Sequence, residues 1–86
     1  MNNPAKQRAA LEDLWRERTE SALRHYRIAK AECAKAISEQ SDVEPPDGTF
    51  GYRKALRAEN TALAEYKRVL TIFTDLTVSG ILPPAE

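Results

Sequence analysis

The residues that could carry out chemistry are few, and their spacing does not assemble a catalytic site. His25 is the sole histidine, and Ser21 lies four residues before it, so a helix would place both on one face. A nucleophile–base pair also requires an orienting acid and an oxyanion hole. Asp13 is about three helical turns away, and no glycine-rich elbow is present. We therefore expect a solvated surface histidine, no catalytic residues and no enzymatic activity.

Metal and cofactor binding are not expected either. Cys33 is the single cysteine, so an internal disulfide and a cysteine knuckle for zinc are both ruled out. No Glu-x-x-His pair of the kind that holds di-metal sites in helical bundles is present. The acids Asp42, Glu44 and Asp47 lack the alternating spacing of a calcium loop, and Pro46 stands at a ligand position. Cys33 falls on an apolar stripe, where we expect a small buried hydrophobe.

Two uninterrupted helical segments must position these residues. No proline or glycine lies between residues 5 and 40 or between residues 52 and 79, whereas Pro45-Pro46-Asp47-Gly48 must break a helix. Asn3-Pro4 suits a helix start and Gly80 suits a helix end. The sequence predicts one domain over residues 1–86, with a helix over about 4–40, a loop over 41–48, a helix over about 49–78 and a tail over 79–86.

Each predicted helix carries an apolar stripe, and the two stripes predict an all-α antiparallel hairpin. The second stripe alternates steps of four and three residues, as in a coiled coil, and runs through Tyr52, Leu56, Glu59, Leu63, Tyr66, Leu70, Phe73 and Thr77. The first runs through Leu11, Trp15, Thr19, Ala22, Tyr26, Ala29, Cys33 and either Ile37 or Ala36. Residues 69–78 are rich in β-branched side chains and also suit a strand, but the unbroken stripe favours a helix.

Folding the chain back at the two prolines also predicts a register between the helices. It places Tyr26 beside Leu63, Cys33 beside Leu56 and Lys30 beside Glu59, so that the basic side chain would balance the acid in the stripe.

Further apolar residues fall outside this seam and predict self-association. A two-helix layer of this size buries too little apolar surface to be well stabilised alone. A second copy would complete a four-helix bundle, and two-fold dimers are the commonest oligomers. The alternative is a different protein that covers the same face. The candidate dimer face consists of Leu14, Ile28, Ala55, Ala62, Val69, Ile72 and Leu76.

The start of the second helix holds the best candidates for contacts with a partner. Arg53, Lys54 and Arg57 oppose the helix dipole there, so they require either nearby acids or an acidic partner surface. Phe50 would staple the helix start or anchor a partner. The tail from Gly80 would pack over the open end of the hairpin or serve as an extended recognition peptide.

Charge and hydropathy limit the classes of function. Thirteen basic and thirteen acidic residues cancel, so nothing steers the chain toward nucleic acid. The longest mostly apolar stretch, residues 69–82, is too short and too polar to span a membrane, and the N-terminus lacks the apolar run of a signal peptide. We expect a cytoplasmic, homodimeric, non-enzymatic interaction module acting as an adaptor, co-chaperone or small regulatory subunit. The alternatives are a nucleic-acid-associated regulator using the basic residues of the dimer, and a bundle enzyme or ligand carrier with a site around Tyr26, Glu59 and Tyr66.

Overall fold

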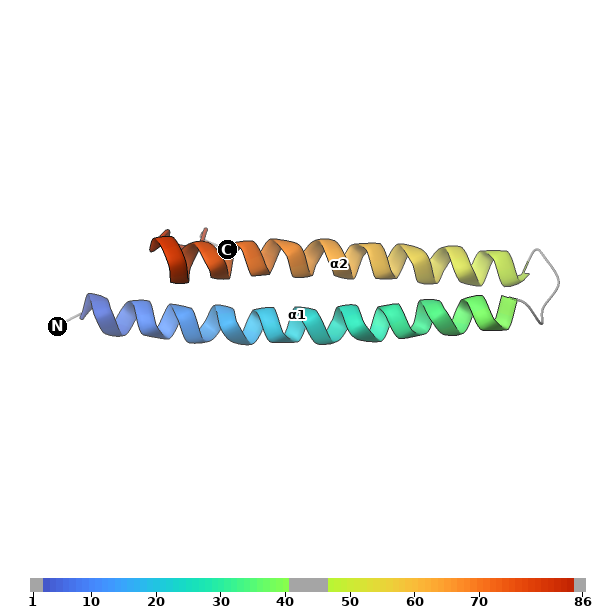
Figure 1. Cartoon of the computed structure of the whole chain (residues 1–86), viewed down its shortest axis with the longest axis horizontal. Coiled ribbons are helices and arrows are strands. Elements are labelled where there is room, and N and C mark those ends of the chain that lie inside the picture. The colour runs from blue at the N-terminus through green and yellow to red at the C-terminus, as the bar shows by residue number, and fades with distance from the viewer. Residues whose placement is uncertain (1–2, 41–46, 85–86) are drawn as a thin grey trace.

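The computed structural model describes residues 3–40 and 47–84, without the side chains of residues 39–40 and 47–50. It consists of two helices, α1 (Pro4–Gln40) and α2 (Asp47–Ser79), and the described residues contain no strand. The helices lie side by side and run in opposite directions (Figure 1). The predicted all-α hairpin is therefore confirmed, including helix rather than strand at residues 69–78. Of the predicted loop, residues 41–46 lie outside the described residues, and residues 47–48 belong to α2, which begins about two residues earlier than predicted.

Local hydrogen bonds explain where α1 begins and α2 ends. Asn3 caps α1, because its side-chain Oδ1 accepts a hydrogen bond from the Ala5 N–H at 3.0 Å. At the other end Gly80 adopts a left-handed φ of 69°, and its N–H donates to the Leu76 carbonyl at 3.2 Å. The guanidinium of Arg8, from α1, also donates to that carbonyl at 3.2 Å. A cation from one helix thus satisfies the exposed carbonyl end of the other.

The hairpin is long and thin. Its principal extents are 64 × 20 × 16 Å, and its radius of gyration of 18.2 Å exceeds the roughly 12 Å expected for a compact chain of this length. The first turns of α1 extend beyond the end of α2 (Figure 1). A molecule only two helices thick has no interior beyond the single seam between them.

That seam combines small and large side chains from both helices. Trp15, Ala22, Val69 and Leu76 form its buried cluster, against which Leu11, Tyr66, Ile72 and Phe73 pack. Ala29 and Cys33 continue the buried row toward the loop. The predicted stripe of α1 is confirmed at Trp15, Ala22, Ala29 and Cys33. Of its two candidate ends, Ala36 is half-buried while Ile37 is 53% exposed.

On α2 one of the two predicted rows of the seam was wrong, whereas Tyr66 and Phe73 of the other row do pack against the buried cluster. Val69 and Leu76, expected beside the seam and free for a second copy, are 2% and 0% exposed and form its centre. Leu70, expected in the seam, is 38% exposed. Two rows of α2 give the coiled-coil alternation of three-residue and four-residue steps when combined with Tyr66 and Phe73. One row contains residues 55, 62, 69 and 76, and the other contains residues 56, 63, 70 and 77, so the periodicity alone fits either row. The row that starts with two alanines, Ala55 and Ala62, allows the closer approach to Ala22 and Ala29.

The register between the helices also differs from the prediction, by about one helical turn. The ring of Tyr26 stacks on Tyr66 with centroids 6.4 Å apart and planes 4° from parallel, three residues beyond the expected Leu63. The Glu59 carboxylate, expected beside Lys30, lies instead close enough to the Cys33 thiol to raise its pKa. Offset aromatic stacking contributes about 0.5–1.5 kcal/mol beyond area burial, which favours the observed register.

Candidate functional site

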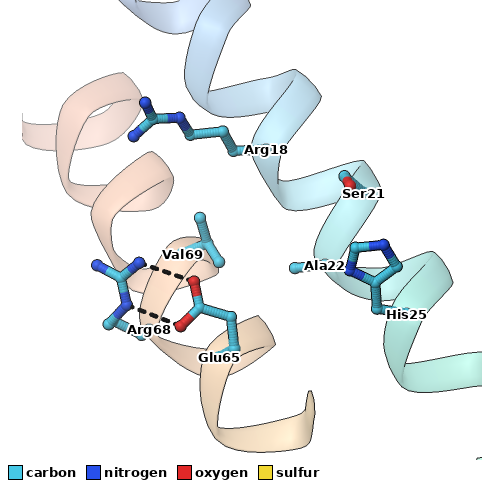
Figure 2. A pocket seen from close by; sticks show the side chains of 7 residues that line it. All are labelled: Arg18, Ser21, Ala22, His25, Glu65, Arg68 and Val69. Carbon is cyan, nitrogen blue, oxygen red and sulfur yellow. Dashed lines mark hydrogen bonds and ion pairs between the residues drawn. The ribbon is translucent and has the colours of Figure 1, made fainter. Parts of the chain in front are cut away.

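A polar groove of about 260 Å³ lies between the helices near their middle. Ala22 and Val69 form its floor, and small Ala22 leaves the space open. In Figure 2, Ser21 and His25 stand on the α1 side and Glu65 and Arg68 on the α2 side. The groove thus brings together the Ser21 hydroxyl and the His25 imidazole, which the sequence analysis considered as a pair, and the Glu65 carboxylate, which it did not consider. Arg18 completes its lining.

The acid in this groove is engaged by its own helix neighbour. Arg68 donates two hydrogen bonds to Glu65, at 2.7 and 3.1 Å, which Figure 2 marks between the two side chains. These hydrogen bonds lower the pKa of the Glu65 carboxyl; partial desolvation opposes the shift, and the positive charge of Arg68 adds a smaller lowering. The carboxylate therefore stays ionised and points to Arg68, not across the groove to His25. The groove is a mixed-charge surface depression.

Cys33 of α1 and Glu59 of α2 bring a thiol and a carboxylate together across the seam. Cys33 is buried on the inner stripe, as predicted. Burial raises the pKa of its thiol, and the Glu59 carboxylate raises it further by accepting the hydrogen bond and by its negative charge. The thiol is thus held in its protonated, weakly nucleophilic form. Across the described residues, no cluster of three histidine, cysteine, aspartate or glutamate side chains is placed to hold a metal ion.

The chain after Gly80 folds back onto the start of α1. Leu82, Pro83 and Pro84 enclose with Leu11, Leu14 and Trp15 an apolar depression of about 340 Å³, which Arg18 completes. The guanidinium of Arg18 lies over the Trp15 ring, 4.6 Å from its centroid. Leu82 is nevertheless 70% exposed, and the two predicted roles of the tail, packing over the open end and recognition by another protein, stay predictions.

The side chains beside the seam separate into two opposite faces. A residue one position before a buried residue lies about 100° to one side of it, and a residue one position after lies about 100° to the other. Ser21 and Arg68 precede Ala22 and Val69 and line the same groove, so they mark one side of the hairpin. We define this side as the groove face.

Residues one position after the buried rows mark the opposite side, which we define as the leucine face. On α2 this row is Leu56, Leu63 and Leu70, and on α1 it includes Leu23 and Ile37 together with Arg16 and Lys30. Leu23, Leu56 and Leu63 are half-buried, while Leu70 and Ile37 are exposed. Sequence reasoning missed this face because it assigned the three leucines of α2 to the seam.

The predicted contact residues do not form one surface. Leu14 and Ile28 are exposed on the groove face, and Ile72 is half-buried on the same side. Ala55 and Ala62 are half-buried in the row of Val69 and Leu76, which the hairpin itself covers. Of the candidate dimer face, Leu14 and Ile28 alone are exposed large side chains.

The basic residues predicted to meet a partner lie at the start of α2. Arg53, Lys54 and Arg57 are exposed there, and contact with an acidic partner stays a prediction. The side chain of Phe50 lies outside the described residues.

We compared the chain with protein-family models, curated proteins and solved structures. No protein-family model, curated protein or solved structure matches this chain. Within the described parts of the chain, neither helix holds a stretch long and apolar enough to cross a membrane.

Proposed function

We propose that this protein is a non-enzymatic interaction module that functions by self-association of its helical hairpin. The observation that carries the proposal is surface area. The chain exposes 6570 Å², whereas a compact monomer of 9.7 kDa exposes roughly 5,100 Å². The excess of roughly 1,400 Å² is more than the roughly 800 Å² that one partner buries in a standard protein–protein interface.

The composition of the surface supports the same proposal. Seven large apolar side chains are exposed among the described residues, on both helices and the tail, and they are Leu14, Ile28, Ile37, Leu70, Val78, Ile81 and Leu82. The core, in contrast, contains two alanines and a cysteine among its six buried residues. Because apolar burial stabilises the fold by roughly 25 cal/mol per Å², covering the exposed apolar side chains adds stability that this seam lacks.

The elongated hairpin suits an adaptor, a co-chaperone or a small regulatory subunit. A dimer would present the exposed basic residues Arg53, Lys54 and Arg57 twice, and such a patch fits an acidic protein surface. The balanced net charge provides no general attraction for the phosphates of nucleic acid.

Size-exclusion chromatography coupled to light scattering tests self-association. The protein is measured from about 1 to 200 μM, a range chosen to bracket dissociation constants typical of modest interfaces. We expect a mass approaching twice the 9.7 kDa of one chain as concentration rises. A mass of one chain throughout this range would contradict the proposal, whatever the elution volume, because an elongated monomer also elutes early.

A further inference from the structure

We infer that the leucine face is the surface on which a second copy of this chain packs. The inference rests on the proposed self-association and goes beyond it by naming the face. Leu23, Ile37, Leu56, Leu63 and Leu70 would form the centre of the contact. None of the three α2 leucines belongs to the buried cluster of the hairpin, so they lack full cover within one chain.

These side chains form successive layers along the hairpin. Leu56, Leu63 and Leu70 recur every seven residues on α2, and Leu23, Lys30 and Ile37 recur every seven on α1. In the observed register, Ile37 lies at the level of Leu56 and Leu23 at the level of Leu70, because Tyr26 stacks on Tyr66. Seven residues of helix rise about 10.5 Å, so the apolar layers extend over about 21 Å.

Polar side chains lie beyond these layers at one end, and Lys30 lies in the middle layer at the level of Leu63. Arg16 and Thr77 occupy the next positions of the two rows. The Arg16 guanidinium lies over the Phe73 ring at 5.7 Å and pairs with Asp13 at 3.1 Å, so its charge is held by its own chain. Lys30 can lay its aliphatic stem along the leucines while its amine stays in water. An apolar centre with a polar rim is typical of specific interfaces.

The dimensions of the face are sufficient for a stable dimer. The two long principal extents, 64 and 20 Å, give a face of roughly 1,300 Å², compared with the roughly 800 Å² that each partner contributes to a standard interface. A contact over two-thirds of the length would therefore suffice, which leaves both ends of the hairpin free.

The groove face is a poorer surface for a second copy. Packing there would remove Ser21, His25 and the Glu65–Arg68 pair from water, and buried polar groups without new partners are costly. On α1 its exposed apolar residues, Leu14 and Ile28, are fourteen positions apart, the same spacing as in the α1 row of the leucine face. On α2, however, the row one position before the buried residues is polar throughout and consists of Lys54, Thr61, Arg68 and Asp75. No continuous apolar row forms on that side.

Two substitutions of the same kind distinguish the faces. Leu70→Glu places a charge on the leucine face, and Ile28→Glu places one on the groove face at a side chain that is 57% exposed. We expect Leu70→Glu to raise the dimer dissociation constant by about 100-fold or more, because a buried carboxylate would have no partner. Ile28→Glu should change it less than about threefold, within the range of ordinary surface substitutions. Loss of the dimer in Ile28→Glu but not in Leu70→Glu would overturn the inference.

A protection measurement covers the case in which Leu70→Glu fails to fold. In a Cys33→Ala background, Leu70→Cys and Ile28→Cys are labelled with a maleimide at protein concentrations below and above dimer formation. We expect labelling of Leu70→Cys to slow as concentration rises, while Ile28→Cys reacts at a constant rate. A dimer by light scattering without protection at position 70 would refute the leucine face alone. A monomer by light scattering would refute the proposed function itself.

Discussion

Shortening Leu76 to alanine is the most direct test of the seam, because the structure and the sequence pattern place this side chain differently. Leu76 is 0% exposed in the buried cluster with Trp15 and Val69, whereas the periodicity alone assigned it to the outside. Leu14→Ala is the matched control, since Leu14 carries the same side chain at 42% exposure on α1. Leucine and alanine have similar helix propensities, so the difference between the two variants reports packing.

The expected magnitude follows from the groups removed. Leu→Ala deletes three carbon groups at about 0.8 kcal/mol each, which gives roughly 2.4 kcal/mol for transfer. The cavity adds to this, and buried Leu→Ala substitutions cost about 2–5 kcal/mol in total. Leu76 lies near the open end of the hairpin, where the tail and Arg8 can relax inward. We therefore expect about 3 kcal/mol, within the roughly 2–5 kcal/mol range.

Urea denaturation followed by far-UV circular dichroism measures this loss. All variants are compared at one protein concentration, because self-association would make stability depend on concentration. With a slope near 1 kcal/mol per molar urea, Leu76→Ala should lower the midpoint by about 3 M, while Leu14→Ala should shift it by less than about 1 M. Equal shifts in the two variants would refute the observed seam and restore the one predicted from periodicity.

Three further predictions concern the end of α2 and the buried thiol. Arg8→Met should lower the free energy of unfolding by about 0.5–1 kcal/mol in the same assay, because the terminal carbonyls of α2 lose their cationic donor. Gly80→Ala should cost about 1 kcal/mol at its φ of 69°, and an unchanged midpoint would contradict the left-handed helix end. Iodoacetamide should alkylate Cys33 slowly in the native protein at pH 8, and Glu59→Gln should accelerate the reaction by lowering the raised pKa of the thiol. A native rate equal to that in urea would show that the thiol is exposed.

The raised pKa of Cys33 also fixes the direction of a pH effect. A thiol that holds its proton more tightly in the folded chain stabilises that chain fully below the pKa of the unfolded thiol. This contribution is lost as pH rises through the folded pKa, so stability should decline on the alkaline side. Glu65 acts in the opposite direction, since its lowered pKa gives a contribution that is lost as pH falls. The exposed Glu65–Arg68 ion pair contributes less than about 1 kcal/mol to the free energy of unfolding.

The elements of this fold could be predicted from the sequence, because their signals are local. Asn3-Pro4 and Gly80 determine the helix ends, and both appear in the structure as a cap and a left-handed turn. The inner stripe of α1 could also be predicted, since Trp15 and Cys33 have no competing row of similar character. The register could not, because it depends on long-range contacts, such as the stack of Tyr26 on Tyr66, that no spacing along the chain specifies.

The candidate dimer face was predicted wrongly on α2 because two apolar rows there fit the same periodicity. That ambiguity bears on how the hairpin would pack with a second copy. Tyr66 and Phe73 have an apolar row on each side, one through Val69 and Leu76 and one through Leu63 and Leu70. A single partner helix covers only two adjacent rows. The helix α1 therefore covers the row of Tyr66 and Phe73 and the row of Val69 and Leu76, and it leaves the row of Leu63 and Leu70 partly in water. Three apolar positions in every seven are typical of a helix that faces several neighbours in a bundle, whereas two in seven suffice for a paired coil. The third row of α2 is therefore the surface that the proposed dimer would use, with the second hairpin supplying the third helix.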